Sequence, residues 1–201
     1  MLRVGLTGGL ACGKTFVGEE LERLGCLVVH ADEIGHEVID PGGEAHDGVL
    51  RLFGAGILDE AGGVDRQALA EKGFGDPDAL ARLNALVHPL VVRREEEIIA
   101  GYAAGNPSGI AVVEAAILVE TGSYKRFDKL ILVFCEECQQ VERAMRRPGA
   151  TEAGVKARLQ RQMALAEKRK YADFVINTSG EKEAAIRQTR EVFEALRRVE
   201  S

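Results

Sequence analysis

The sequence lacks long hydrophobic runs, and we expect no secretory leader. No apolar stretch in its 201 residues approaches the roughly 20 residues that a membrane-spanning helix requires. The beginning, MLRVGLTGG, has neither the long apolar core nor the small-residue cleavage site of a signal peptide. Only four cysteines occur, and their spacing does not suggest a disulfide framework, which suits a reducing compartment. We therefore expect a cytoplasmic protein that does not associate with membranes.

A general excess of positive charge is also missing. The formal net charge of −6 at pH 7 argues against broad affinity for nucleic acid. Residues 140–170 are an exception, because nine Lys and Arg residues stand there against three Glu, a local charge of +6 in a chain whose remainder carries −12. Such a basic segment in an acidic protein needs a local explanation.

Short runs of Val, Ile and Leu alternate with helical patterns along the whole chain. Strands are expected at residues 2–8, 26–32, 109–120, 128–135 and 172–180. Helices are expected at residues 13–24, 44–53, 77–104, 136–147, 151–168 and 181–199. Strands that are separated by helices and continuously apolar indicate a parallel sheet covered on both faces. The expected fold class is therefore α/β, with helical excursions at 40–105 and 140–168, in one domain without repeats or long linkers.

The first glycine-rich stretch, GLTGGLACGKT, carries the chemistry. Gly8, four further residues, and then Gly13, Lys14 and Thr15 fit the pattern G-x-x-x-x-G-K-[ST], between an expected strand and an expected helix. Glycines let successive N–H groups surround a phosphate, and the helix start adds partial positive charge. Lys14 is expected to bridge the β- and γ-phosphates, and the Thr15 hydroxyl to bind Mg²⁺. The sequence predicts a protein that binds a nucleoside triphosphate.

Several classes of protein use such a loop. The D-x-x-G matches DEIG (32–35) and DEAG (59–62) are compatible with a GTPase, but no guanine-reading N-K-x-D element occurs. A small-molecule kinase needs a base, an acceptor pocket and cations around the transferred group. Asp32, expected at the end of the second strand, could orient or deprotonate a hydroxyl, hold a magnesium-bound water, or cap the next helix. Arg143 and Arg147 share a helix face in the basic segment, which suits a lid or a solvated helix.

These residues belong to a longer series of motifs. After the glycine-rich loop come VVHADEIGHEVIDPGGEA, LNALVHPLV, AILVETG, QQVERAMRR and RQMALAEKRKYADFVINTSG, in this order up to residue 180. The series resembles the dephospho-CoA kinase family, in particular its D-A-D, L-N-x-x-x-H-P, P-L-L-F-E, Q-x-x-R-x-x-x-R and A-D…I-x-N-x-G elements. The resemblance implies that ATP and 3′-dephospho-CoA give ADP and CoA, with Mg²⁺ on the phosphates, at the last step of CoA biosynthesis.

The resemblance also implies roles for individual residues. The catalytic residues would be Asp32 as base, Lys14 and Arg143, and Thr15 would bind Mg²⁺. ATP would contact Gly8, Ala11, Cys12, Gly13, Lys14, Thr15, Phe16, Arg143, Arg147 and Asn177. The acceptor would contact Asp32, Asn84, His88 and Glu120. A structural hydrogen bond is an alternative role for His88, and a position at a helix start is an alternative for Glu120.

The expected organisation is a single P-loop kinase domain with three parts. A core comprises about 1–40, 106–139 and 170–201, a helical acceptor-binding part about 41–105, and a lid about 140–169. The expected partners are ATP and dephospho-CoA, without nucleic acid or membrane, in a monomer or weak homo-oligomer. Two alternatives stay open from the sequence: another P-loop nucleoside or nucleotide kinase, and a nucleotide-dependent regulatory protein.

Three positions depart from the family pattern. His30 stands where the first aspartate of D-A-D is usual, and Ala116 stands in place of a proline. Cys12 lies within the loop where small residues such as serine are usual, and a thiol at a helix start can have a lowered pKa and oxidise readily. We therefore predict reversible inhibition by peroxide through Cys12.

Two further features of the sequence allow more than one interpretation. Glu114 resembles the acid that ends a Walker B strand, which could support Mg²⁺ through water. Cys135 and Cys138 form a C-x-x-C pair without a second pair, so we expect them to pack at a strand end and a helix start rather than to bind zinc.

Overall fold

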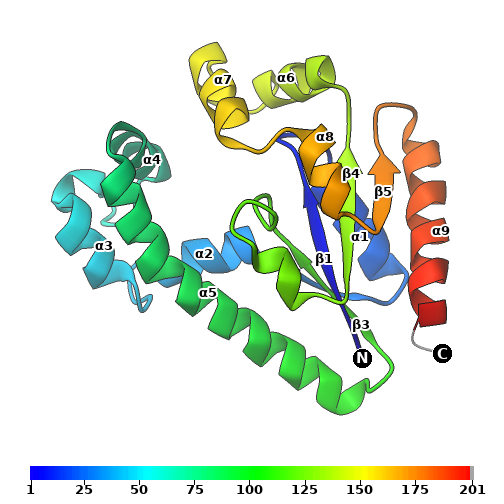
Figure 1. Cartoon of the computed structure of the whole chain (residues 1–201). Coiled ribbons are helices and arrows are strands. Elements are labelled where there is room, and N and C mark those ends of the chain that lie inside the picture. Colours follow the sequence, from blue (N-terminus) through cyan, green and yellow to red (C-terminus); the bar gives the residue numbers. More distant parts are fainter. Residues whose placement is uncertain (200–201) are drawn as a thin grey trace. The chain divides into compact units, whose positions relative to one another are not determined.

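One part of the chain is built on a parallel five-stranded sheet (Figure 1). The computed structural model describes residues 1–199, apart from the side chains at positions 71, 74, 75 and 77. The strands are β1 (Leu2–Gly8), β2 (Leu27–His30), β3 (Ile110–Glu114), β4 (Lys129–Phe134) and β5 (Phe174–Asn177), in the spatial order β2-β3-β1-β4-β5. All neighbouring strands are parallel. The prediction of an α/β fold is confirmed.

Helices occupy most of the chain between the strands. The α-helices are α1 (Lys14–Arg23), α2 (Ala31–Ile39), α3 (His46–Phe53), α4 (Arg66–Gly75), α5 (Pro77–Gly105), α6 (Glu137–Met145), α7 (Glu152–Arg161), α8 (Leu165–Lys168) and α9 (Lys182–Val199). Short 3-10 helices are η1 (Ala55–Ile57), η2 (Ser123–Arg126) and η3 (Arg169–Tyr171). In residues 1–199, no helix has the combined length and apolar character that crossing a bilayer requires.

Four expected boundaries were wrong. The strand expected at 172–180 is the shorter β5, which ends at Asn177. The strand expected at 26–32 ends at His30, so Asp32 lies in the first turn of α2 and does not end the strand. The strand expected at 109–120 ends at Glu114, where its neighbour β2 also ends. Of the apolar residues that follow it, Ala115, Leu118 and Val119 are buried by packing rather than by strand pairing, whereas Ile117 is exposed. The helix expected at 151–168 is interrupted at 162–164, between α7 and α8.

The chain forms two compact units. Residues 1–30 and the chain from 101 onward form the unit that contains the sheet, and residues 31–100 form the other. The second unit has its own hydrophobic core, made of Ile39, Ala45, Val49, Ile57, Val64 and Leu69. The assignment of an acceptor-binding part and a lid concerns their function and remains a prediction.

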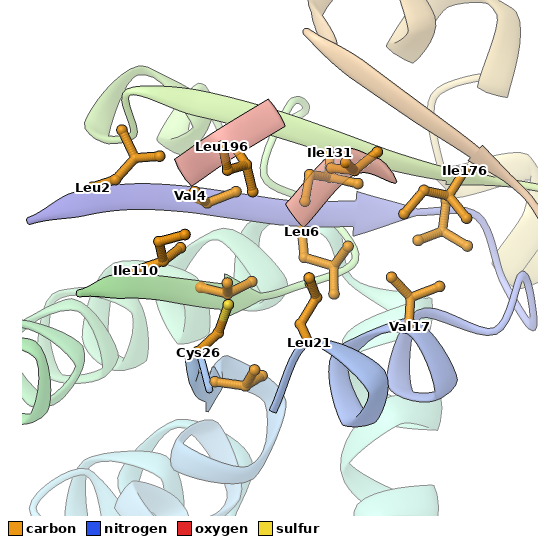
Figure 2. Packing of buried hydrophobic residues seen from close by; sticks show 14 of the residues in the cluster. Leu2, Val4, Leu6, Val17, Leu21, Cys26, Ile110, Ile131, Ile176 and Leu196 are labelled. Atoms are coloured by element: carbon orange, nitrogen blue, oxygen red, sulfur yellow. The ribbon is translucent and has the colours of Figure 1, made fainter. Parts of the chain in front are cut away.

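Alternate side chains of β1 build the core of the sheet unit (Figure 2). Leu2, Val4 and Leu6 point to one face, where α1 and α9 pack against each other over the sheet. The opposite face approaches the backbone closely, because a Cβ atom on Gly5 would lie 2.9 Å from a side-chain carbon of Leu130. Burial on both faces explains the continuous apolar composition of this strand. The carboxyl ends of the strands meet at one edge, where functional residues of such sheets gather.

Candidate active site

The loop between β1 and α1, residues 9–13, has the backbone of a phosphate-binding loop. Ala11 and Gly13 adopt left-handed conformations, with φ angles of 55° and 81°, and α1 starts directly after Gly13. Gly8 is also required by packing against backbone, and Gly9 lies close to a side chain. A Cβ atom on Gly8 would lie 2.5 Å from the Val133 carbonyl oxygen, and one on Gly9 would lie 2.5 Å from a side-chain oxygen of Gln140. These glycines therefore allow the loop to pack closely against its neighbours, and they also leave room for a bound phosphate.

A pocket of about 180 Å³ opens at this loop. Its lining consists of Ala11, Gly13, Lys14, Thr15, Arg143 and Arg147. All six residues are among those that the sequence proposes for ATP. Lys14 Nζ donates to the Gly9 carbonyl oxygen at 3.2 Å, so its ammonium group lies over the loop. The pocket thus joins backbone, one lysine, one hydroxyl and two guanidinium groups, a set suited to a polyphosphate.

Arg143 is fixed in position by the residue that follows β5. Its Nη2 donates to the Thr178 carbonyl oxygen at 2.7 Å, and its Nη1 to the Thr178 hydroxyl at 3.3 Å. That hydroxyl is 2.7 Å from the Cys12 carbonyl oxygen, to which it donates. Arg143 is half-buried, whereas Arg147, one turn further along the chain, is exposed. The loop and the guanidinium group are therefore connected through a single threonine.

An apolar cluster holds α6 and α7 against the loop. Leu10, Ala144 and Val155 are buried together, with Ala11 and Leu159 packed around them. Because these contacts involve both the loop and the basic helices, they place the arginines of α6 beside the loop.

Glu114 connects the loop helix with β2. Its Oε1 accepts a hydrogen bond of 3.0 Å from the Thr15 hydroxyl, and its Oε2 lies 3.0 Å from His30 Nδ1. The carboxylate is buried at the end of β3, directly beside His30 in the sheet register. His30, which replaces the usual aspartate, thus belongs to the same cluster as Thr15. This contact joins residues far apart in sequence, and only the Walker B resemblance of Glu114 gave a signal for it.

Oxygen donors at this cluster suit Mg²⁺. Mg²⁺ in phosphate sites typically binds one or two protein oxygens and completes its shell with phosphates and water. The Thr15 hydroxyl and the Glu114 carboxylate provide donors of this type. Within residues 1–199, no group of three or more His, Cys, Asp and Glu side chains is arranged to hold a metal on its own. The Thr15 hydroxyl and the Glu114 carboxylate fit a cation that arrives with a polyphosphate.

Two thiols meet beneath the loop. Cys135 Sγ donates to Cys12 Sγ at 3.3 Å, and neither side chain is exposed. This hydrogen bond is the largest influence on Cys12 and lowers the pKa of its thiol to about 7, against the opposing effect of burial. As the donor, Cys135 has a raised pKa. Cys138 is exposed, so the C-x-x-C residues lie in different environments. The expected packing role holds for Cys135, but its pairing with Cys12 was not anticipated.

Other residues proposed for ATP lie outside the pocket lining. Gly8 ends β1, and Cys12 is buried beneath the loop. Phe16 is half-buried and packs against the core. Asn177 ends β5, and its side-chain oxygen accepts a hydrogen bond of 2.8 Å from the Ser179 N–H. Contacts of these four residues with ATP remain predictions.

Three residues proposed for the acceptor belong to the unit of residues 31–100. Asp32 is exposed in the first turn of α2. Asn84 and His88 are exposed one turn apart on α5, so they can reach the same ligand. Their roles remain predictions.

Glu120, the fourth residue proposed for the acceptor, belongs to the sheet unit and has a buried partner. Its Oε1 lies 2.8 Å from Lys168 Nζ and accepts a bond of 3.0 Å from the Met163 N–H. Its Oε2 is buried without a hydrogen-bond partner in the described part of the chain. In the sequence Lys168 belongs to the basic segment that suits a lid or a solvated helix, whereas the structure buries it completely.

The sheet order, the loop and its pocket define a P-loop kinase. A family model described as dephospho-CoA kinase matches residues 2–183. The dephospho-CoA kinase of Aquifex aeolicus is 38% identical over 200 residues, which cover 98% of this chain and 99% of the relative. The chain belongs to the dephospho-CoA kinase family.

Solved structures agree with this fold. A crystal structure of a Thermus thermophilus protein has a TM-score of 0.82 at 28% identity and covers 96% of both chains. The structure of dephospho-CoA kinase from Campylobacter jejuni has a TM-score of 0.71 at 24% identity, over 99% of this chain and 98% of that chain, and supports the fold alone.

Proposed function

We propose that this chain transfers the γ-phosphoryl group of ATP to the ribose 3′-hydroxyl of dephospho-CoA and produces ADP and CoA. The observation that carries the proposal is the pocket in which Lys14, Thr15 and Arg143 meet, in a chain of the dephospho-CoA kinase family. Phosphoryl transfer needs positioning and charge stabilisation more than covalent chemistry from the protein. A pocket of fixed cations and loop N–H groups supplies both.

The donor side of the reaction uses the loop. The N–H groups of Gly9, Ala11 and Gly13 would surround the β-phosphate, since that of Leu10 donates to Gln162 and that of Cys12 to Gly9. Lys14 would exchange the Gly9 carbonyl for phosphate oxygens. Arg143, held by Thr178, would lie beside the γ-phosphoryl group as negative charge moves toward the leaving oxygen. Because Arg143 is fixed before the nucleotide binds, little reorganisation is needed during transfer.

Magnesium would be held by Thr15, with Glu114 orienting the hydroxyl and its surrounding water. When bound, Mg²⁺ neutralises charge on the β- and γ-phosphates. His30 contacts the other Glu114 oxygen and so restricts the rotation of this carboxylate.

The acceptor side is assigned to the unit of residues 31–100. Asp32 would accept the proton of the 3′-hydroxyl or orient it, since an exposed carboxylate in a first helical turn is available to a ligand. Asn84 and His88 would contact the CoA portion, together with Glu120 of the sheet unit. Gly8, Cys12, Phe16 and Asn177 would complete the ATP environment. The segment 140–169 would cover the phosphates and exclude water, which limits hydrolysis of ATP.

Cellular context follows from the substrates. ATP and dephospho-CoA are cytoplasmic metabolites in this proposal, and the chain would act there as a monomer or weak homo-oligomer. Neither nucleic acid nor a membrane has a role in the reaction.

The test is a coupled assay of ADP release with purified full chain. ADP release that depends on dephospho-CoA, with CoA identified as the product, would support the proposal. Adenosine and AMP serve as alternative acceptors, and preference for either would indicate a different P-loop kinase. Slow ATP hydrolysis that no acceptor accelerates would indicate a nucleotide-dependent regulatory protein and contradict the proposal.

A further inference from the structure

A completely buried lysine lies behind the phosphate-binding loop. Lys168, on α8, is the largest fully buried side chain among the described residues. Its Nζ donates to the Ala116 carbonyl oxygen at 2.7 Å and to the Gly8 carbonyl oxygen at 3.3 Å, and it pairs with Glu120 Oε1 at 2.8 Å. A buried ammonium group is strongly unfavourable unless it is paired and hydrogen-bonded, and here three oxygens surround it.

The partners of Lys168 define where the loop begins. Gly8 is the last residue of β1, and its carbonyl belongs to the same planar peptide group as the Gly9 N–H. In a trans peptide these two groups point in opposite directions, so fixing the carbonyl also fixes the first N–H of the loop. The Ala116 carbonyl also accepts from the Thr7 hydroxyl, at 3.2 Å. Lys168 therefore connects the exit of β3 with the start of the loop.

The segment that leads to Lys168 touches the loop a second time. Gln162 Oε1 accepts a hydrogen bond of 2.8 Å from the Leu10 N–H. The next residue, Met163, donates its N–H to Glu120 Oε1 at 3.0 Å. Residues 162–168 thus hold two peptide groups at the start of the loop, and Glu120 fixes this segment from the opposite side.

We propose that Lys168 is a positioning residue for the nucleotide's phosphates, which acts through the Gly8 peptide, with Gln162 as a second support at Leu10. The inference rests on the proposed function, because it assumes that the loop binds the donor phosphates. Glu120 balances the charge of Lys168 at 2.8 Å, so the contribution of Lys168 is the direction of the loop's N–H groups rather than long-range attraction.

Nucleotide affinity in the folded protein tests this role. Lys168→Met keeps a side chain of similar length but removes the three polar contacts of the ammonium group. We expect this variant to weaken ADP binding, measured by calorimetry, about tenfold. Gln162→Ala should weaken ADP binding less, by about threefold, because it removes one bond to the loop. KM for dephospho-CoA should change by less than about twofold in Gln162→Ala, because this variant leaves Glu120, which is proposed for the acceptor, paired with Lys168.

The matched control is Lys129→Met. Lys129 pairs with Asp173 at 3.0 Å at the start of β4, the opposite end of that strand from the loop. We expect a lower melting temperature and unchanged ADP affinity. If Lys168→Met also lowers the melting temperature while ADP binds as in the wild type, Lys168 is only structural and the inference is overturned.

Further measurements distinguish a failure of this inference from misfolding of Lys168→Met and from a failure of the proposed function. Should Lys168→Met not fold, Gln162→Ala and Glu120→Gln decide the matter, and wild-type ADP affinity in both would overturn the inference. Wild-type protein that binds ADP but transfers nothing to dephospho-CoA would contradict the proposed function, while the comparison of ADP affinities would still test Lys168.

Discussion

The Thr15 hydroxyl donates a hydrogen bond of 3.0 Å to Glu114 Oε1, and this contact joins the first turn of α1 to the last residue of β3. The sheet register places Glu114 beside both Leu6 and His30. The carboxylate is therefore held by the backbone of the sheet before any ligand binds. A rigid acceptor of this kind can orient a hydroxyl toward a cation.

Glu114→Gln should raise the Mg²⁺ concentration that gives half-maximal activity by about tenfold, because the amide is a weaker acceptor for Thr15 and carries no charge. The measurement is kcat as a function of Mg²⁺ at saturating ATP. Glu19→Gln, which changes an exposed carboxylate on α1, is the control and should behave as wild type. An unchanged Mg²⁺ dependence of Glu114→Gln would remove Glu114 from the cation site.

Local patterns in the sequence predicted the strands β1 and β4 and the helix α1 to within one or two residues. Of the residues 11–16 proposed for ATP, Ala11, Gly13, Lys14 and Thr15 line the pocket, whereas Cys12 and Phe16 do not. Apolar composition alone extended β3 to residue 120, because buried loop residues and buried strand residues have the same composition. The end of β3 depends on where its neighbour β2 ends, which is information from the tertiary structure.

Arg143→Ala should lower kcat by about 100-fold and change ATP affinity much less, because the guanidinium group acts where charge develops during transfer. Steady-state kinetics with ATP and dephospho-CoA would measure both parameters. Arg146→Ala is the matched control, since Arg146 lies on the same chain segment, pairs with Glu142 and is not in the pocket lining. Equal effects of the two substitutions would contradict a specific role for Arg143.

Asp32→Asn should lower kcat by about 100-fold or more and leave ADP affinity unchanged, because the amide cannot accept a proton from the 3′-hydroxyl. The control is Glu33→Gln, a neighbouring exposed carboxylate in the same first turn of α2. Near-normal turnover of Asp32→Asn would exclude Asp32 as the base. ADP affinity from calorimetry separates this result from a general loss of folding.

The contacts that the sequence could not predict join residues that are far apart along the chain. Lys168 and Glu120 are 48 positions apart, and Cys12 and Cys135 are 123 apart. In the sequence, Lys168 is one cation among many in a basic segment. Lys168 is buried because α8 packs beside the end of β1, where its Nζ reaches the Gly8 carbonyl oxygen. The local sequence pattern does not predict this packing.

Peroxide should inactivate the enzyme reversibly, because Cys12 has a partner for disulfide formation. The Cys12 thiolate attacks the peroxide O–O bond and becomes a sulfenic acid with release of water. The Cys135 thiol then attacks that sulfur and releases a second water, so two thiols and one hydrogen peroxide give one disulfide and two waters. Because Cys12 lies between the left-handed residues Ala11 and Gly13, closing the 3.3 Å separation distorts the loop.

The linked peptides should be detected by mass spectrometry without reductant, and dithiothreitol should restore activity. Cys138→Ser removes the exposed thiol and should leave this behaviour unchanged. Cys135→Ser should abolish the disulfide. Wild-type protein that keeps full activity while the Cys12–Cys135 peptide is present would contradict the prediction.

The rate of peroxide inactivation should depend on pH through Cys12. The hydrogen bond from Cys135 lowers the pKa of Cys12 to about 7, whereas burial raises that of Cys26 to about 12. Below pH 7 Cys12 is a protonated and unreactive thiol, and above pH 7 it is a thiolate. The inactivation rate should therefore rise about tenfold between roughly pH 6 and pH 8 and then level off. In Cys135→Ala the hydrogen-bond donor to Cys12 is lost, and a midpoint that stays near pH 7 there would show that Cys135 is not the cause of the shift. A wild-type rate that still rises steeply above about pH 9 would instead exclude a lowered pKa at Cys12.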